Sequence, residues 1–166
     1  MSPEAFGAMA GRVLARLAKH VDLALATVDL TLSQYRLLSF LADGEAASSR
    51  LAGLMAISPP SVTSVVDGLV ARGLVERRPD PSDRRRQSLV LTASGRAALV
   101  EADGAVGERL EGLLAFLDGS RSEVARDALG DWRDALDQHR AARQGMTATP
   151  VSAAPTSAAP MNAATP

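Results

Sequence analysis

Hydrophobic residues recur every three or four positions over most of the chain, and this spacing is typical of amphipathic helices. The first such stretch predicts a helix over about residues 3–27. No proline lies between residues 4 and 58 or between 82 and 149, so long helices are permitted in both stretches. The apolar stripe of the first helix consists of Phe6, Met9, Val13, Leu14, Leu17, Val21, Leu25 and Val28.

A second helix is indicated where Thr31 precedes Gln34 by three positions. In this capping-box pattern the threonine side chain caps the helix, and the glutamine reaches back to the threonine amide. The helix should end near Asp43 and Gly44, two residues that favour turns.

The third and fourth helices should form a helix-turn-helix. A short helix over about 47–55 would direct Leu51 and Leu54 inward. The next helix takes Ser58 as its N-cap and Pro59 as its first residue, positions that suit both residue types. Only about two residues separate the helices, which is the spacing of a motif whose second helix enters the DNA major groove by its N-terminal end.

A hairpin with a basic tip is predicted next. Gly73 should end the fourth helix, and the segments 74–77 and 88–92 have the composition of short strands. The loop between them, residues 79–86, combines turn-forming residues with three consecutive arginines. A short helix with a polar face, followed by such a hairpin, suits the two grooves of a DNA duplex.

Two further helices should follow the hairpin. One begins at Thr92 or Ala93, and its apolar stripe should consist of Leu99, Val100, Val106, Leu110, Leu113, Leu114 and Leu117. Its glycines at 104, 107 and 112 either weaken it or allow close helix approach. The last helix should start at a second capping box, residues 120–123. The expected order is four helices, two strands and two helices, a mainly α (α+β) fold.

The last segment, residues 144–166, has no charged side chain and is rich in Ala, Thr, Ser and Pro. Because it lacks the apolar content that would offset its ordering entropy, we expect it to be disordered. Because a small winged core could not fully cover the apolar stripes of the terminal helices, we expect residues 1–30 and 93–143 to form a helical dimerisation region around a DNA-binding domain at 31–92. An intramolecular two-helix flap is the alternative.

Composition excludes several classes of protein. The chain has 46% hydrophobic but only 3% aromatic residues, which favours a core of aliphatic side chains. The absence of cysteine excludes disulfides and zinc–thiolate sites, and with two histidines a metal site is not expected. No stretch of 18 apolar residues and no export signal was found, so a cytoplasmic protein without a membrane span is expected. No phosphate loop, nucleophile elbow or HExxH helix is found, which argues against an enzyme or a cofactor.

Charge is distributed unevenly along the chain. The net charge is −1, yet residues 72–86 hold six arginines against three acidic residues, a local charge of +3. Binding to nucleic acid depends on such a local field rather than on the total charge. A solvated charged loop is the alternative explanation when this loop is considered alone.

The candidate DNA contacts fall into two groups. Small hydroxyl side chains on the fourth helix can bond phosphates or base edges, and arginines suit the negative potential of a narrow minor groove. Asp83, placed among arginines, would orient Arg85 or cap the turn. The candidates are Ser58, Pro60, Ser61, Thr63, Ser64, Arg72, Asp83, Arg84, Arg85 and Arg86.

The densest run of these features, residues 66–95, resembles the winged helix-turn-helix of the MarR family of bacterial regulators. The matching positions include Val66-Asp67, Arg72-Gly73-Leu74-Val75, Asp83-Arg84-Arg85 and Leu91-Thr92, and the resemblance covers about residues 5–142. It implies a homodimer on double-stranded, pseudo-palindromic DNA, with Asp83 and Arg85 as a wing pair. It also implies a repressor that releases DNA when a lipophilic or phenolic anion binds.

The sequence departs from this family pattern in two places, and both concern operator recognition. The double proline at 59–60 stiffens the start of the reading helix, and Ser64 stands where the family often has a larger side chain. The operator sequence therefore cannot be carried over from the family.

For the effector, Arg16, His20 and Tyr35 lie where the family usually binds its ligand, and an arginine with a histidine can hold a carboxylate or phenolate. Surface or dimer contacts are the alternative role for Arg16 and His20. For the whole protein, a non-specific architectural DNA-binding protein and a transcriptional activator of the same fold remain open alternatives.

Overall fold

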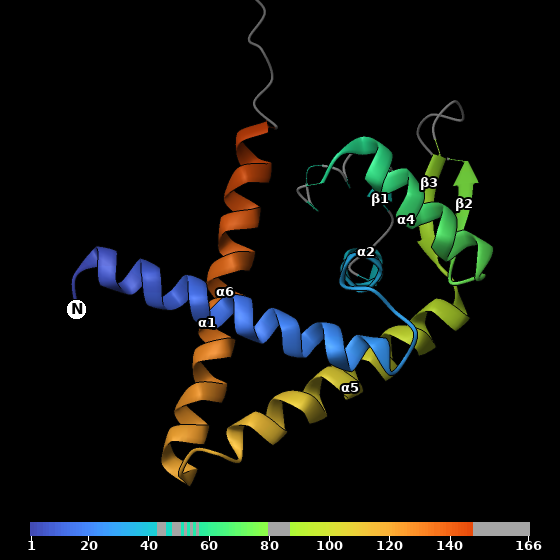
Figure 1. Ribbon diagram of the computed structural model, residues 1–166. Coiled ribbons are helices and arrows are strands. Elements are labelled where there is room, and N and C mark those ends of the chain that lie inside the picture. Colours follow the sequence, from blue (N-terminus) through green and yellow to red (C-terminus); the bar gives the residue numbers. More distant parts are fainter. Residues whose placement is uncertain are drawn as a thin grey trace, which may run out of the picture. The chain divides into compact units, whose positions relative to one another are not determined.

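The computed structural model describes residues 1–42, 46–47, 51, 53, 55, 57–79 and 87–147 (Figure 1). The hairpin tip at 80–86 and the segment from 148 to 166 lie outside the described residues, as does most of the expected third helix. The chain divides into two compact units, residues 1–117 and 118–166, which are described separately.

The described part of the chain is mainly helical with a small antiparallel sheet, which confirms the predicted winged helix-turn-helix fold. In the first unit, α1 and α5 lie side by side, and α2 packs against both α4 and α5 (Figure 1). The second unit contains α6. The elements run α1 (Pro3–Ala26), α2 (Leu32–Ala42), β1 (Ala46–Ala47), α4 (Pro59–Ala71), β2 (Val75–Pro79), β3 (Gln87–Leu91), α5 (Ala93–Leu114) and α6 (Gly119–Thr147).

The sheet contains a strand that the sequence did not predict. Ala47, expected to begin the third helix, belongs to β1 and pairs with Ser88 of β3, so the strand order is β1-β3-β2. A two-residue strand is too short to show the alternation that marks strands in a sequence. By pairing with β3, it covers an edge whose backbone groups would otherwise lack partners. Leu51 is helical and fully buried, as predicted, whereas Leu54 lies outside the described residues.

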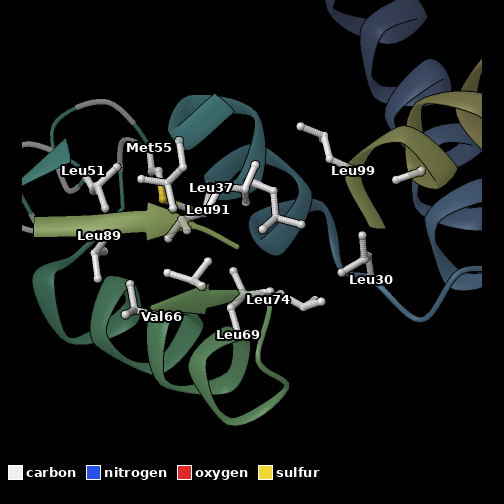
Figure 2. Packing of buried hydrophobic residues seen from close by; sticks show 14 of the residues in the cluster. Leu30, Leu37, Leu51, Met55, Val66, Leu69, Leu74, Leu89, Leu91 and Leu99 are labelled. Atoms are coloured by element: carbon white, nitrogen blue, oxygen red, sulfur yellow. The ribbon is translucent and has the colours of Figure 1, made fainter. Parts of the chain in front are cut away.

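The core of the first unit is aliphatic, as the composition predicted. Figure 2 shows Val66 and Leu69 of α4 pointing toward the strand that carries Leu89. The buried hydrophobic side chains among the described residues include no aromatic ring. One prediction for the α5 stripe is wrong, because Val100 is 70% exposed. It follows Leu99, which does face the core, and adjacent helical residues point in different directions.

Two helices end with the same backbone geometry. At the end of α4 the amide of Gly73 donates to the Val70 carbonyl at 2.9 Å, and that of Leu74 donates to Leu69 at 3.0 Å. This is a Schellman motif, and Gly73 takes the left-handed conformation that it requires, with φ of 67°. The prediction that Gly73 stops the helix is therefore confirmed.

The end of α1 repeats that pattern without a glycine. The amide of Leu30 donates to the Leu25 carbonyl at 3.0 Å, and that of Asp29 to Ala26 at 3.4 Å. Asp29 occupies the left-handed position, with φ of 55°. Aspartate and asparagine tolerate this conformation better than most residues with a side chain.

The predicted capping boxes differ in outcome. The first is confirmed, since the Thr31 amide donates to Gln34 Oε1 at 2.9 Å and the Gln34 amide to Thr31 Oγ1 at 3.2 Å. The second is wrong, because α6 begins two residues earlier than predicted and Asp118, not Ser120, is its cap. Asp118 Oδ1 accepts from the Arg121 amide at 2.9 Å and from Ser120 Oγ at 2.8 Å. These two bonds, the backbone one first, lower the pKa of Asp118.

The boundary of the C-terminal segment also differs from the prediction. Helix α6 continues through Thr147 and so includes residues 144–147, which were expected to be disordered. A helix can extend through uncharged residues of good helix propensity such as Gln144 and Met146. The rest of the expected disordered segment lies outside the described residues.

Thr92 joins α5 to the end of α4 and the start of β2. Its hydroxyl oxygen accepts from the Gly95 amide at 2.9 Å and lies 2.8 Å from the Gly73 carbonyl and 3.1 Å from that of Leu74. A Cβ on Gly95 would lie 2.0 Å from the Leu74 carbonyl oxygen. Close approach in α5 therefore occurs at Gly95, whereas the glycines at 104, 107 and 112 have nothing within 4 Å of an added Cβ.

Candidate nucleic-acid interface

Helix α4 has one buried face and one polar, exposed face. Val62, Val66 and Leu69 are buried in the core and fix the helix in one rotation about its axis. The residues predicted to read DNA therefore lie on the solvent side. All five are exposed: Ser58, Pro60, Ser61, Thr63 and Ser64.

Local hydrogen bonds hold several of these hydroxyl groups in place. Ser58 is the N-cap, and its Oγ accepts from the Ser61 amide at 3.4 Å and lies 2.8 Å from Ser61 Oγ. Thr63 Oγ1 donates to the Pro59 carbonyl at 3.2 Å. Because Pro59 and Pro60 have no N–H, the start of this helix offers fewer backbone donors than usual, and hydroxyl groups supply the remaining polar surface.

Arg72 is bonded within the protein. This predicted phosphate contact is the C-cap of α4, where its Nη1 donates to the Asp29 carbonyl at 2.6 Å. Its Nη2 lies 3.2 Å from Asp29 Oδ2. Both ends of its guanidinium therefore have an acceptor in the turn after α1.

Two arginines of β2 have partners that the sequence did not assign. Arg77 Nη2 lies 2.5 Å from Asp67 Oδ1 and so ties the hairpin to α4. Arg78 pairs with Glu76 on the same strand. The sequence did contain a signal for the first pair. Asp67 lies on the exposed face of the helix that is expected to approach phosphates, and a negative charge there is unfavourable unless a nearby cation such as Arg77 neutralises it.

The hairpin brings together the two ends of its loop. Its register pairs Val75 with Leu91 and Pro79 with Gln87. The wing candidates Asp83, Arg84, Arg85 and Arg86 belong to the intervening segment and lie outside the described residues.

The three candidate effector residues occupy different environments. Arg16 is exposed on α1, whereas His20 and Tyr35 are half-buried. The arginine that bonds His20 is Arg109 of α5, whose Nε donates to His20 Nδ1 at 3.0 Å. The sequence pointed instead to Arg16, because Arg109 is distant in the chain and only the packing of α5 on α1 brings it close to His20.

Tyr35 is also linked to α5. Its hydroxyl donates to Asp103 Oδ1 at 2.7 Å. Burial, followed by the hydrogen bond and the charge of Asp103, raises the pKa of Tyr35 to about 12. Asp103 and Arg109 are the two polar residues here that the sequence analysis missed, and neither belongs to a recognisable motif.

Large apolar side chains are exposed on the terminal helices. In α1 they are Phe6, Met9, Val13 and Leu14, which are 46–65% exposed. In α6 they are Val124, Leu129, Trp132 and Leu136, which are 52–67% exposed. None of the helices in the described ranges is long and apolar enough to cross a membrane.

Helix α4, with its outward polar face, followed by the hairpin of β2 and β3, is the arrangement of a winged-helix DNA-binding protein. Comparison with known proteins agrees with this class. A sequence model described as MarR family matches residues 28–86. The regulator MT0903.1 of Mycobacterium tuberculosis (strain CDC 1551 / Oshkosh), called an HTH-type transcriptional regulator, is 32% identical over 114 residues, which cover 68% of this chain and 80% of that protein.

Two solved structures extend the comparison. The transcriptional repressor CouR, bound to a 23-mer DNA duplex, shares 32% identity with a TM-score of 0.65, over 79% of this chain and 91% of CouR. The Mycobacterium tuberculosis MarR family protein RV2887, in complex with p-aminosalicylic acid, shares 28% identity with a TM-score of 0.64, over 76% of this chain and 96% of that one. The chain described here belongs to the MarR family: it is a DNA-binding transcriptional regulator and not an enzyme.

Proposed function

We propose that this protein is a homodimeric, cytoplasmic repressor that binds a pseudo-palindromic operator and releases it when a small aromatic or lipophilic anion binds. The observation that carries the proposal is the division of α4 into a buried apolar face and an exposed hydroxyl-rich face. A helix held this way presents its N-terminal residues to a major groove. The DNA-bound repressor CouR supports the same use of this fold.

The proposed DNA contacts on α4 are Ser58, Pro60, Ser61, Thr63 and Ser64, and those on the wing are Asp83, Arg84, Arg85 and Arg86. The α4 residues would read base edges and phosphates, whereas the wing arginines would enter the minor groove. Of the residues predicted from the sequence, we withdraw Arg72 from this set, since Asp29 already binds its guanidinium.

A second copy of the chain is the proposed partner of the exposed apolar side chains. Four large apolar residues on α1 and four on α6 are about half exposed or more. Large apolar side chains exposed on one helix are typical of an association site, and most soluble oligomers are symmetric dimers. A dimer places two reading helices about one turn of DNA apart, which explains the expected symmetry of the operator.

The proposed effector site lies where α1 and α2 meet α5. Arg109 donates to His20 through Nε, which leaves its terminal nitrogens available to a carboxylate or phenolate. RV2887 in complex with p-aminosalicylic acid, an aromatic acid, supports this ligand class. Arg16 on α1 would add a further positive charge near the entrance to such a site.

The decisive experiment begins by recovering genomic fragments with the purified protein and measuring their affinity by fluorescence anisotropy. A specific repressor should prefer its recovered site over random duplexes by about a thousandfold or more. Equal affinity for random duplexes would identify an architectural protein instead. In vitro transcription from the recovered promoter distinguishes a repressor, which lowers transcript yield, from an activator, which raises it.

A matched pair of variants tests the reading helix. Ser64→Glu places a negative charge toward the phosphates, whereas Ser64→Gln adds a side chain of the same size without charge. We expect Ser64→Glu to weaken binding at least tenfold more than Ser64→Gln, and the difference should shrink as salt rises. Wild-type affinity in both variants, with unchanged circular dichroism, would place Ser64 away from the DNA.

A further inference from the structure

Arg72 and Asp29 connect two helix ends that are far apart in the sequence. Arg72 Nη1 donates to the Asp29 main-chain carbonyl at 2.6 Å, and its Nη2 lies 3.2 Å from the Asp29 carboxylate. The Arg72 side chain is 35% exposed, whereas that of Asp29 is 95% exposed. The Asp29 carboxylate is therefore almost fully open to water, and the bond to its carbonyl is exposed as well.

The backbone at Asp29 is unusual in a way that Arg72 addresses. Among the described residues, Asp29 is the one non-glycine residue with positive φ. Such a conformation carries a cost and persists where neighbouring groups hold it in place. Arg72 binds both the carbonyl and the side chain of Asp29, so it helps to hold the turn at the residue with positive φ.

The two ends belong to different parts of the first unit. Helix α1 packs on α2 and α5, whereas α4 packs on α2 and β2. Arg72, the C-cap of α4, therefore joins the end of the reading helix directly to the turn that follows α1. A shift of that turn would move the end of α4 through a charge-assisted bond as well as through apolar packing.

We propose that Arg72 and Asp29 form a latch that positions the reading helix, and that Arg72 is a positioning residue that does not contact phosphate. The proposal rests on the DNA-binding function proposed above. It assigns a role to the carbonyl and carboxylate of Asp29 beyond ending α1, which its left-handed backbone already does. Direct binding of Arg72 to the DNA backbone is the competing possibility, and it predicts an effect of opposite sign at Asp29.

The test measures affinity for the recovered operator with Asp29→Asn, Arg72→Gln and the double variant. Asparagine tolerates the left-handed backbone and keeps the main-chain acceptor, so it removes only the charge. A latch predicts that each single variant binds about threefold to fivefold more weakly and that the double variant is no weaker than Arg72→Gln. The dependence of affinity on salt should keep its slope in all three variants. Asp22→Asn, an exposed charge removal on α1, is the matched control and should leave affinity unchanged.

A phosphate contact gives different results. Removing the Asp29 charge would release Arg72, so Asp29→Asn would bind DNA more tightly, and Arg72→Gln would reduce the slope of log affinity against log salt by about one. Either result, or an unchanged affinity in Asp29→Asn, overturns the latch.

A measurement without DNA separates the latch from the proposed function. Hydrogen exchange at the amides of Gly73 and Leu74, which close the end of α4, should quicken in both variants, and more in Arg72→Gln, which loses the contact to the Asp29 carbonyl as well as the one to its carboxylate. Unchanged exchange in both variants overturns the latch even if DNA binding is confirmed. A wild-type protein without preference for any duplex would overturn the proposed function, and exchange would still decide whether the two residues act together.

Discussion

The winged region and the terminal helices differ in how far their apolar side chains are buried. Within residues 31–92 most of the large aliphatic side chains of α2, α4 and β3 are buried, several of them completely. In the first half of α1 and along α6, large apolar side chains are about half exposed or more. Both regions contain regular helices, so the backbone conformation alone does not distinguish them.

This difference shows which part of the protein is stabilised by its own core. Burial of apolar area is the main source of folding stability, and the winged region obtains it within a single chain. The apolar residues of α1 and α6 gain little stability until another surface covers them. The same kind of sequence pattern thus stabilises the fold in one region and, in the other, supplies the surface that we propose for association.

The largest expected effect compares two leucines. Leu37 is fully buried and Leu136 is 63% exposed. We expect Leu37→Ala to lower the free energy of unfolding by about 2–5 kcal/mol. Leu136→Ala should change it by less than about 0.5 kcal/mol under conditions where the protein is monomeric. Urea denaturation of both variants at low protein concentration measures the two values.

The leucine comparison has a second measurement. In analytical ultracentrifugation, Leu136→Ala should shift the protein toward monomer, whereas Leu37→Ala should not do so at temperatures where it remains folded. If Leu136→Ala destabilises the monomer as much as Leu37→Ala does, then α6 contributes to a core within one chain and the contrast between the regions is wrong.

A smaller effect compares two glycines of α5. A methyl group at Gly95 would meet the Leu74 carbonyl oxygen at 2.0 Å, whereas one at Gly112 would meet nothing within 4 Å. Because the obstacle at Gly95 is backbone, we expect Gly95→Ala to cost about 1–3 kcal/mol. Gly112→Ala should instead stabilise the helix by up to about 1 kcal/mol, owing to the higher helix propensity of alanine. Thermal unfolding of the two variants should therefore shift in opposite directions, and a tolerated Gly95→Ala would show that the base of α5 can move.

The smallest effect concerns the junction between α2 and α5. Tyr35 is the one tyrosine in the sequence, so its ionisation can be followed by absorbance near 295 nm without overlap. Its pKa of about 12 lies above the ordinary value of 10.0, mainly because of burial and then because of Asp103. The unfolded chain therefore loses this proton first as pH rises. The stability that Tyr35 contributes is fully present below pH 10 and is lost as pH approaches 12.

Two controls accompany that titration. In denaturant the absorbance midpoint should return to about 10, and in Asp103→Asn it should fall between the folded and unfolded values. A folded midpoint near 10 would show that the Tyr35 hydroxyl is open to water and that the junction with α5 is loosely packed.

Much of the fold was predictable because its signals are local. The cap at Ser58, the capping box at Thr31 and Gln34, and the helix stop at Gly73 each involve residues within a few positions of one another. Strand β1 was not predictable, since two alanines carry no pattern and pair only with a strand some forty positions later. The cap at Asp118 was not predicted, because Ser120 and Glu123 have the spacing of a capping box and so favoured Ser120 as the cap.

The candidate site divides in the same manner. The exposed residues of α4 follow from the helical period once the apolar stripe is known. The partners of Arg72, His20 and Tyr35 do not follow from it, because Asp29, Arg109 and Asp103 reach them only through packing of separate helices. Charged residues on a helix surface have many possible neighbours, and periodicity does not choose among them.

The attachment of α5 at Thr92 relates small rotations at its first turn to larger displacements at its C-terminal end. The 22 residues of α5 span about 33 Å. At its first turn, Thr92 Oγ1 accepts from the Gly95 amide of α5 and lies close to the carbonyls of Gly73 and Leu74. If α5 tilted by about 5° about its first turn, its C-terminal end would move by about 3 Å, given the length of the helix. Because α5 packs along α1 and α2, such a tilt would carry those helices with it, and a small rotation beside the wing would correspond to a larger displacement at the other end of α5.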